Sequence, residues 1–143
     1  MKDDRELELV LNQALFIHIA LADQGIPYVV PLCFGYRNRC IYLHGAPGGK
    51  KHQIMDRHNV VSFNCVADAA VVPGEHACSW TMNFRSVSGI GRARFITCPE
   101  EKHEALTCIM EHYGHVGEVH FPDIDRIEVI CIHVDTMTGK QRL

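Results

Sequence analysis

The sequence predicts a mainly β protein, a small antiparallel β-barrel of six to seven strands with few helices. Apolar runs of strand length mostly follow one another along the chain, and few segments show helical periodicity. A parallel sheet would need a helix at each crossover, so antiparallel pairing is expected. The 143 residues are 47% hydrophobic and 22% charged, which suits a single folded domain over residues 1–143.

The first expected elements are a helix and two strands. Asp3 or Asp4 is placed to cap the helix. The near-continuous apolar run Leu15–Ala22 predicts the first strand. After a turn at residues 23–25, large side chains alternate through Tyr28–Tyr36 and predict the second strand. One apolar face of the helix is formed by Leu7, Val10, Leu11 and Ala14.

Strands around one short helix are expected in the middle of the chain. A hairpin connection at Arg37–Arg39 leads into the strand Cys40–His44. A helix over Lys51–His58 and a buried strand at Val60–Val66 follow. The segment Trp80–Ile96 contains at least one long strand, which its glycines break or bend.

A helix and a strand complete the expected order. Thr97 and Glu100 have the spacing of a capping box at the start of the helix, and Gly114 ends it. The last strand is expected at Ile127–Val134. The apolar face of this helix is formed by Leu106, Ile109, Met110 and Tyr113.

The segment Tyr42–Lys51 has the chemistry of a phosphate-binding loop. It runs from an apolar strand through a glycine-rich turn to Lys50 and Lys51. Glycines let backbone N–H groups close around an anion, lysines neutralise it, and the next helix adds free N–H donors. An ATP or GTP loop is excluded because Lys51 stands where the magnesium-binding Ser or Thr belongs. The alternative is a plain β-turn before a solvated basic helix.

Two further features fit either a ligand site or a structural role. Pro31 cannot donate a ladder hydrogen bond, so its strand should lie at a sheet edge. There it either offers backbone groups to a planar heterocycle or only prevents aggregation. Gly89 and Gly91 lie on one face of the predicted long strand and leave there a bare strip, a surface without side chains. This strip either bends the barrel or admits a flat ring or another backbone. Without a third glycine, the pair is not a dinucleotide fingerprint.

Composition excludes several function classes. The net charge is −3 and the basic residues are scattered, so neither nucleic acid nor a membrane surface is an expected partner. No apolar stretch reaches the length of about 18 residues that spans a bilayer. The ten histidines show no zinc-motif spacing, so we expect no metal. Seven cysteines without a C-x-x-C motif or a secretory signal predict reduced, mostly buried thiols and a cytoplasmic location.

Three ordered segments together resemble the flavin-binding split-barrel superfamily. They read G-I-P-Y-V-V-P-L at 25–32, Y-L-H-G-A-P-G-G-K-K at 42–51 and W-T-M-N-F-R-S-V-S-G-I-G-R-A at 80–93. The sequence is most similar to the short pyridoxamine 5′-phosphate oxidase-related proteins, which include nitroimidazole-resistance flavoproteins. The resemblance spans residues 5–139.

This resemblance implies a homodimer with two FMN molecules at its interface. The first segment would line the isoalloxazine ring, and the second would add contacts and grip the phosphate with its two lysines. The third would reach the flavin, often from the second subunit. The cofactor-binding residues implied are Tyr28, Val29, Val30, Pro31, His44, Gly45, Ala46, Lys50, Lys51, Arg85, Ser86 and Val87.

The implied chemistry is that of the flavin, with electrons from NAD(P)H passing to a nitroaromatic or quinone-like acceptor. No catalytic residue is assigned, although His44 is a candidate for proton handling. The chain ends at Leu143, so we do not expect the C-terminal Trp and Arg elements of true pyridoxamine phosphate oxidases. A haem-binding split barrel and a non-catalytic flavin-binding module are the alternatives.

Overall fold

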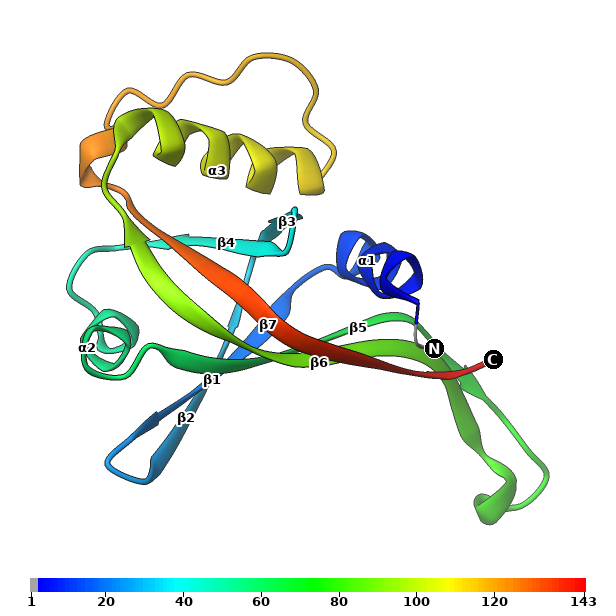
Figure 1. Cartoon of the computed structure of the whole chain (residues 1–143). Helices are drawn as coiled ribbons and strands as arrows, with labels where there is room; N and C mark the ends of the chain where they lie inside the picture. The colour runs from blue at the N-terminus through cyan, green and yellow to red at the C-terminus, as the bar shows by residue number, and fades with distance from the viewer. Residues whose placement is uncertain (1–2) are drawn as a thin grey trace.

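The computed structural model describes residues 3–143, which form seven strands and three α-helices (Figure 1). All neighbouring strands are antiparallel, in the order β2-β1-β5-β6-β7-β4-β3. The strands are β1 (Ile17–Asp23), β2 (Ile26–Leu32), β3 (Gly35–Arg37), β4 (Cys40–Gly45), β5 (Val60–Val72), β6 (Thr81–Ile96) and β7 (Glu128–Arg142). The helices are α1 (Asp4–Gln13), α2 (Lys50–Arg57) and α3 (Pro99–His112), with short 3₁₀ turns η1 (Ala77–Ser79) and η2 (Ile124–Arg126).

The two long strands β6 and β7 form the middle of the sheet. Their pairing extends from Phe84 opposite Arg142 to Ile96 opposite Val129, with a register shift after Ile90. Figure 1 shows both strands curving along the length of the molecule, with α3 across one end and α2 on the side away from α1. The curvature gives the sheet a concave face on which a core can form.

The main core lies on the inner face of this curved sheet. Alternate residues of each strand point into it, as expected for period-two burial. Its fully buried side chains include Ile17, Ile19, Val61, Phe63, Ile130 and Ile132, and α1 covers them with Val10 and Leu11. A second, smaller core lies under α3 and contains Ile96, Ala105, Leu106, Ile109, Val129 and Cys131. The first half of β7 is therefore buried on both faces.

The mainly β, antiparallel fold class is confirmed, and so are several local expectations. The Asp3 carboxylate caps α1 by accepting a hydrogen bond from the Arg5 backbone N–H at 3.0 Å. Gly114 follows the end of α3 in the left-handed region, with φ of +99°. Pro31 lies in β2, which is an edge strand as predicted.

The predicted single strand Tyr28–Tyr36 is wrong, because the chain forms two strands there. β2 ends at Leu32 and β3 begins at Gly35, and the two lie at opposite edges of the sheet. Phe34 between them is fully buried, and its backbone N–H donates to the Tyr113 hydroxyl at 3.1 Å rather than to a strand. The prediction failed because large residues alternate without interruption through 28–36, so the pattern gives no sign of this break.

Other element boundaries also differ from expectation. The last strand runs on to Arg142 and the strand predicted at Val60–Val66 runs on to Val72, because both pair with the first half of β6. The capping box at Thr97 is wrong. Pro99 occupies the first turn of α3, so the N-cap is Cys98, which makes no side-chain cap bond.

Gly89 and Gly91 allow a close approach within the sheet. A Cβ at Gly89 would lie 2.4 Å from the Thr136 carbonyl oxygen and 2.5 Å from the Phe63 ring. A Cβ at Gly91 would lie 2.5 Å from the His133 carbonyl oxygen. A ring and a backbone of the same chain therefore fill the bare strip, which supports its structural role in bending the barrel.

We predict that Gly89→Ala destabilises the fold by about 1–3 kcal/mol, the usual cost of overpacking a well-packed site. The added methyl group would meet a backbone oxygen that cannot move without disturbing the β6–β7 pairing. Urea denaturation followed by circular dichroism measures the change. Gln141→Ala is the control, because it shortens an exposed side chain on the partner strand β7 and adds no atom to the sheet. Equal stabilities of the two variants would contradict the prediction.

Candidate functional site

The phosphate-loop candidate lies between the end of β4 and the start of α2. Gly48 has φ of +77°, a conformation that other residues rarely adopt, and it turns the chain into the helix. Gly49 is the N-cap of α2 and offers no capping side chain. Ile54 and Met55 are buried and anchor the eight-residue helix to the barrel. The free N–H groups of the first turn are thus held at a fixed position.

Two lysines begin α2, and its first turn contains no acidic residue. The positive end of a helix dipole disfavours cations, usually by about 0.3–1 kcal/mol each. This end of α2 therefore concentrates positive charge that the chain itself only partly offsets. A bound anion would relieve the repulsion.

Lys50 links this loop to the edge strand β2. Its ammonium lies 4.8 Å from the centre of the Tyr28 ring, in a cation–π arrangement. Tyr28 and Val30 pack against the main core, whereas Val29 is 62% exposed on the other face of β2. Two parts of the predicted site, far apart in sequence, are thus brought together.

Lys51 lies on the other side of the loop, against β4. Its ammonium is 3.0 Å from the position that a Cβ on Gly45 would take, so the glycine leaves room for it. Partial burial lowers the pKa of Lys51, and the nearby Glu128 carboxylate opposes this shift.

His44 is exposed at the end of β4, beside Lys51. Partial desolvation lowers the pKa of His44, and repulsion from the Lys51 ammonium lowers it further. The imidazole is therefore neutral at pH 7 and can accept a proton.

The predicted residues Arg85, Ser86 and Val87 lie elsewhere in the chain. They belong to the first half of β6, which pairs with the far part of β5, and Figure 1 shows this hairpin projecting away from α2. Val87 is fully buried, so its side chain contributes to the core. Arg85 lies 3.7 Å from the Asp68 carboxylate. Within one chain, the structure does not bring this segment to the lysines.

Sequence reasoning missed two residues at the lysine end. Glu128, the first residue of β7, is buried opposite Gly45, and its carboxylate contacts the His52 ring. His52 also stacks on Phe95 with ring centres 4.3 Å apart. In the sequence, Glu128 could have been found as an acidic residue directly before the apolar run at 129–132 of the last strand.

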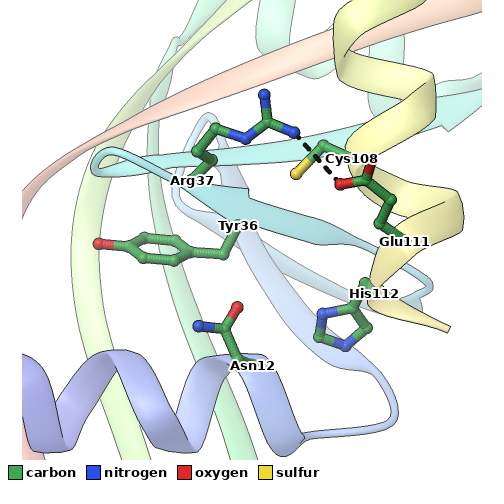
Figure 2. Close-up of a pocket in the computed structure, with 6 residues that line it drawn as sticks. All are labelled: Asn12, Tyr36, Arg37, Cys108, Glu111 and His112. Atoms are coloured by element: carbon green, nitrogen blue, oxygen red, sulfur yellow. Dashed lines mark ion pairs between the residues drawn. The ribbon is translucent and has the colours of Figure 1, made fainter. Parts of the chain in front are cut away.

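A separate cavity of about 220 Å³ lies between α1, β3 and α3. Figure 2 shows its lining residues, with Arg37 paired to Glu111 at 3.5 Å. The His112 ring is hydrogen-bonded to the Ala14 carbonyl oxygen at 2.7 Å. None of the predicted site residues lines this cavity. Because its charged groups are paired with each other, it offers no unsatisfied charge to a phosphate.

Among residues 3–143, no group of three or more His, Cys, Asp or Glu side chains is arranged to hold a metal ion. The helices in the same part of the chain are too short or too polar to cross a bilayer. The prediction that most cysteines are buried is wrong. Cys33, Cys78 and Cys98 are exposed, because they lie in connecting segments.

The curved antiparallel sheet with its edge-strand site is a split barrel. The model of the pyridoxamine 5′-phosphate oxidase family matches residues 3–141, and the chain belongs to this family. A search of curated protein sequences gives no match.

Solved structures agree with this assignment. The chain is 34% identical to a candidate 5-nitroimidazole antibiotic resistance protein from Bacteroides thetaiotaomicron, over 97% of this chain and 84% of that one, with a TM-score of 0.85. A FAD and haem binding protein from Mycobacterium smegmatis is 16% identical over 99% and 72% of the two chains, with a TM-score of 0.84. A FAD-binding protein from Mesorhizobium loti is 21% identical over 99% and 96%, with a TM-score of 0.73. The latter two show the shared fold.

We predict that His44 titrates below the ordinary histidine value of 6.5 and that Lys51→Ala raises its pKa. The substitution removes the positive charge that repels the protonated ring. Proton NMR of the imidazole Cε1–H across pH 4 to 8 measures the titration. Lys50→Ala is the matched control and should leave it unchanged. The prediction fails if Lys51→Ala lowers the pKa or leaves it as it is.

Proposed function

We propose that this chain is an FMN-binding oxidoreductase in which α2 and the end of β4 hold the cofactor phosphate. The observation that carries the proposal is the pair of lysines at the uncapped N-terminus of α2, beside an edge strand that presents free backbone groups. Family membership supports it, since the chain matches the pyridoxamine 5′-phosphate oxidase model almost throughout.

The charge at this end favours FMN over FAD as the ligand. A terminal phosphate monoester carries nearly two negative charges at pH 7 and three acceptor oxygens. Two ammonium groups and the helix N-terminus match that charge. Each phosphate of a FAD pyrophosphate carries only one charge. The named FAD-binding neighbours make FAD the competitor to test.

The edge strand β2 fits the flavin ring. Its outer edge has no strand neighbour, so its backbone groups are free to bond the heteroatoms of a planar ring. Tyr28 connects that edge to Lys50, so the ring and phosphate subsites would form one continuous surface.

A homodimer completes the proposed site. The outer face of the sheet exposes apolar side chains on four neighbouring strands, a pattern typical of interfaces. Val29, Ala20, Ser62 and Ile90 lie in one cross-strand row on this face. The face also exposes Phe16, Val60 and Val66. We propose that a second copy of the chain covers this face and that the flavin binds at the interface between the two copies.

When bound, FMN supplies hydride or single-electron transfer. The residues of the chain bind and orient it, and neutral His44 beside the site can take up a proton from solvent or substrate. NAD(P)H is the proposed electron donor. A nitroaromatic or quinone-like compound is the proposed acceptor, in keeping with the named nitroimidazole resistance protein that is 34% identical.

Two other functions are distinguished by simple assays. The neighbour named as binding FAD and haem favours a haem-binding split barrel as the second candidate. Titration with hemin should then produce a Soret shift that free hemin does not show. A non-catalytic flavin-binding module would bind FMN but consume no NADH or NADPH with any acceptor.

We predict that the double variant Lys50→Ala, Lys51→Ala weakens FMN binding by about 3 kcal/mol, roughly 100-fold, on the scale of charge-assisted hydrogen bonds. Riboflavin, which lacks the phosphate, should lose little affinity. Isothermal titration calorimetry with both ligands measures the difference. FAD is titrated in parallel and should bind more weakly than FMN to the unsubstituted protein.

The control is the double variant Arg5→Ala, Arg126→Ala, which removes two exposed positive charges elsewhere. It should retain FMN affinity. Equal losses for FMN and riboflavin in the lysine variant would refute the phosphate assignment, and tighter binding of FAD would refute the choice of cofactor.

A further inference from the structure

Glu128 is a buried carboxylate that the proposed function does not yet use. Its side chain is 8% exposed, and one oxygen contacts Nδ1 of His52. The other oxygen, Oε1, is fully buried and has no hydrogen-bond partner among the described residues. Burying a carboxylate is costly unless its charge is compensated. A cation close to this oxygen would compensate the charge of the carboxylate.

Lys51 is the ammonium in position to compensate it. Glu128 pairs with Gly45 across the β4–β7 ladder, and the Lys51 ammonium lies against that same glycine. The distance exceeds that of a direct ion pair, since no salt bridge joins the two side chains. The carboxylate thus acts on the lysine through space while leaving its N–H groups free.

The other groups around Lys51 are cationic, titratable or apolar. Lys50 and His52 belong to α2 itself, and His44 approaches from β4. Phe95 from β6 is covered by the His52 ring. Glu128 from β7 is the acidic group that acts on Lys51.

We propose that Glu128 is a positioning residue of the phosphate subsite: it fixes the first turn of α2 through His52 and supplies the counter-charge for the half-buried Lys51 ammonium. This inference rests on the proposed function, because the subsite matters only if a phosphate binds there. Glu128 contacts His52 directly and acts on Lys51 through its charge, and it is not placed to contact the ligand.

The expected pH dependence follows from the charge of Lys51. Burial already lowers the pKa of this lysine and Glu128 raises it, so Glu128→Gln should lower it further. The protonated lysine binds phosphate and the neutral lysine does not. FMN affinity should therefore fall at a lower pH in the variant than in the unsubstituted protein.

The first test needs no flavin. Titration of ¹³Cε-labelled lysine by NMR from about pH 6 to 11 follows Lys51, whose signal is assigned by its absence from Lys51→Arg. Glu128→Gln should move the Lys51 titration to lower pH. Asp56→Asn, which removes an exposed carboxylate from α2, should not. An unchanged Lys51 titration in Glu128→Gln would overturn the proposal. If the Gln variant folds poorly, Glu128→Asp serves in its place: it keeps the negative charge and should leave the Lys51 titration close to that of the unsubstituted protein.

The second test measures FMN and riboflavin affinity against pH. In Glu128→Gln the ratio of FMN to riboflavin affinity should fall at high pH by about tenfold for each unit by which the Lys51 pKa drops. If this ratio changes with pH in the same way in both proteins, the inference is overturned. If Glu128→Gln still prefers FMN to riboflavin at pH 7, the proposed function stands. If the unsubstituted protein binds neither flavin, the proposed function fails, and the lysine titration still decides the role of Glu128.

Discussion

The long ladder between β6 and β7 determines where both cores and the candidate site lie. These strands pair over most of their length, and the missing side chains of Gly89 and Gly91 let backbone and the Phe63 ring approach closely where the sheet bends. The sheet separates the main core from the smaller one under α3, because alternate residues at the start of β7 point into each. The start of β7 also pairs with β4, and this pairing sets where His44 and Gly45 lie. The lysine-bearing loop begins at that point.

The candidate site is an unfavourable cluster of positive charges where the chain passes from β4 into α2. Two lysines lie at the positive end of α2, one over an aromatic ring and one half-buried beside a glycine. A helix would normally place acidic residues there. Among residues 3–143, Glu128 is the buried carboxylate, and one of its oxygens already contacts His52. A bound anion would stabilise this arrangement, and we propose that the phosphate of a flavin is that anion.

Local sequence patterns predicted much of the fold and located two segments of the candidate site, the edge strand β2 and the lysines of α2. Period-two burial located most strands, and Pro31 correctly marked an edge, because both signals depend on residues close in sequence. The break at Phe34 could not be predicted, since it depends on the Tyr113 hydroxyl that lies 79 residues away. Glu128 was missed for the same reason: its burial opposite Gly45 arises only when β4 and β7 pair. The separation of Arg85 from the lysines likewise becomes visible only in three dimensions.

The absorbance spectrum of the purified protein, recorded before and after denaturation, decides whether the chain binds FMN. We expect the two-banded spectrum of an oxidised flavin, and release of FMN in a ratio of one per chain. Release of FAD would contradict the choice of cofactor, and a Soret band without flavin would move the function to haem binding. A colourless protein that also fails to bind added FMN would contradict the account as a whole.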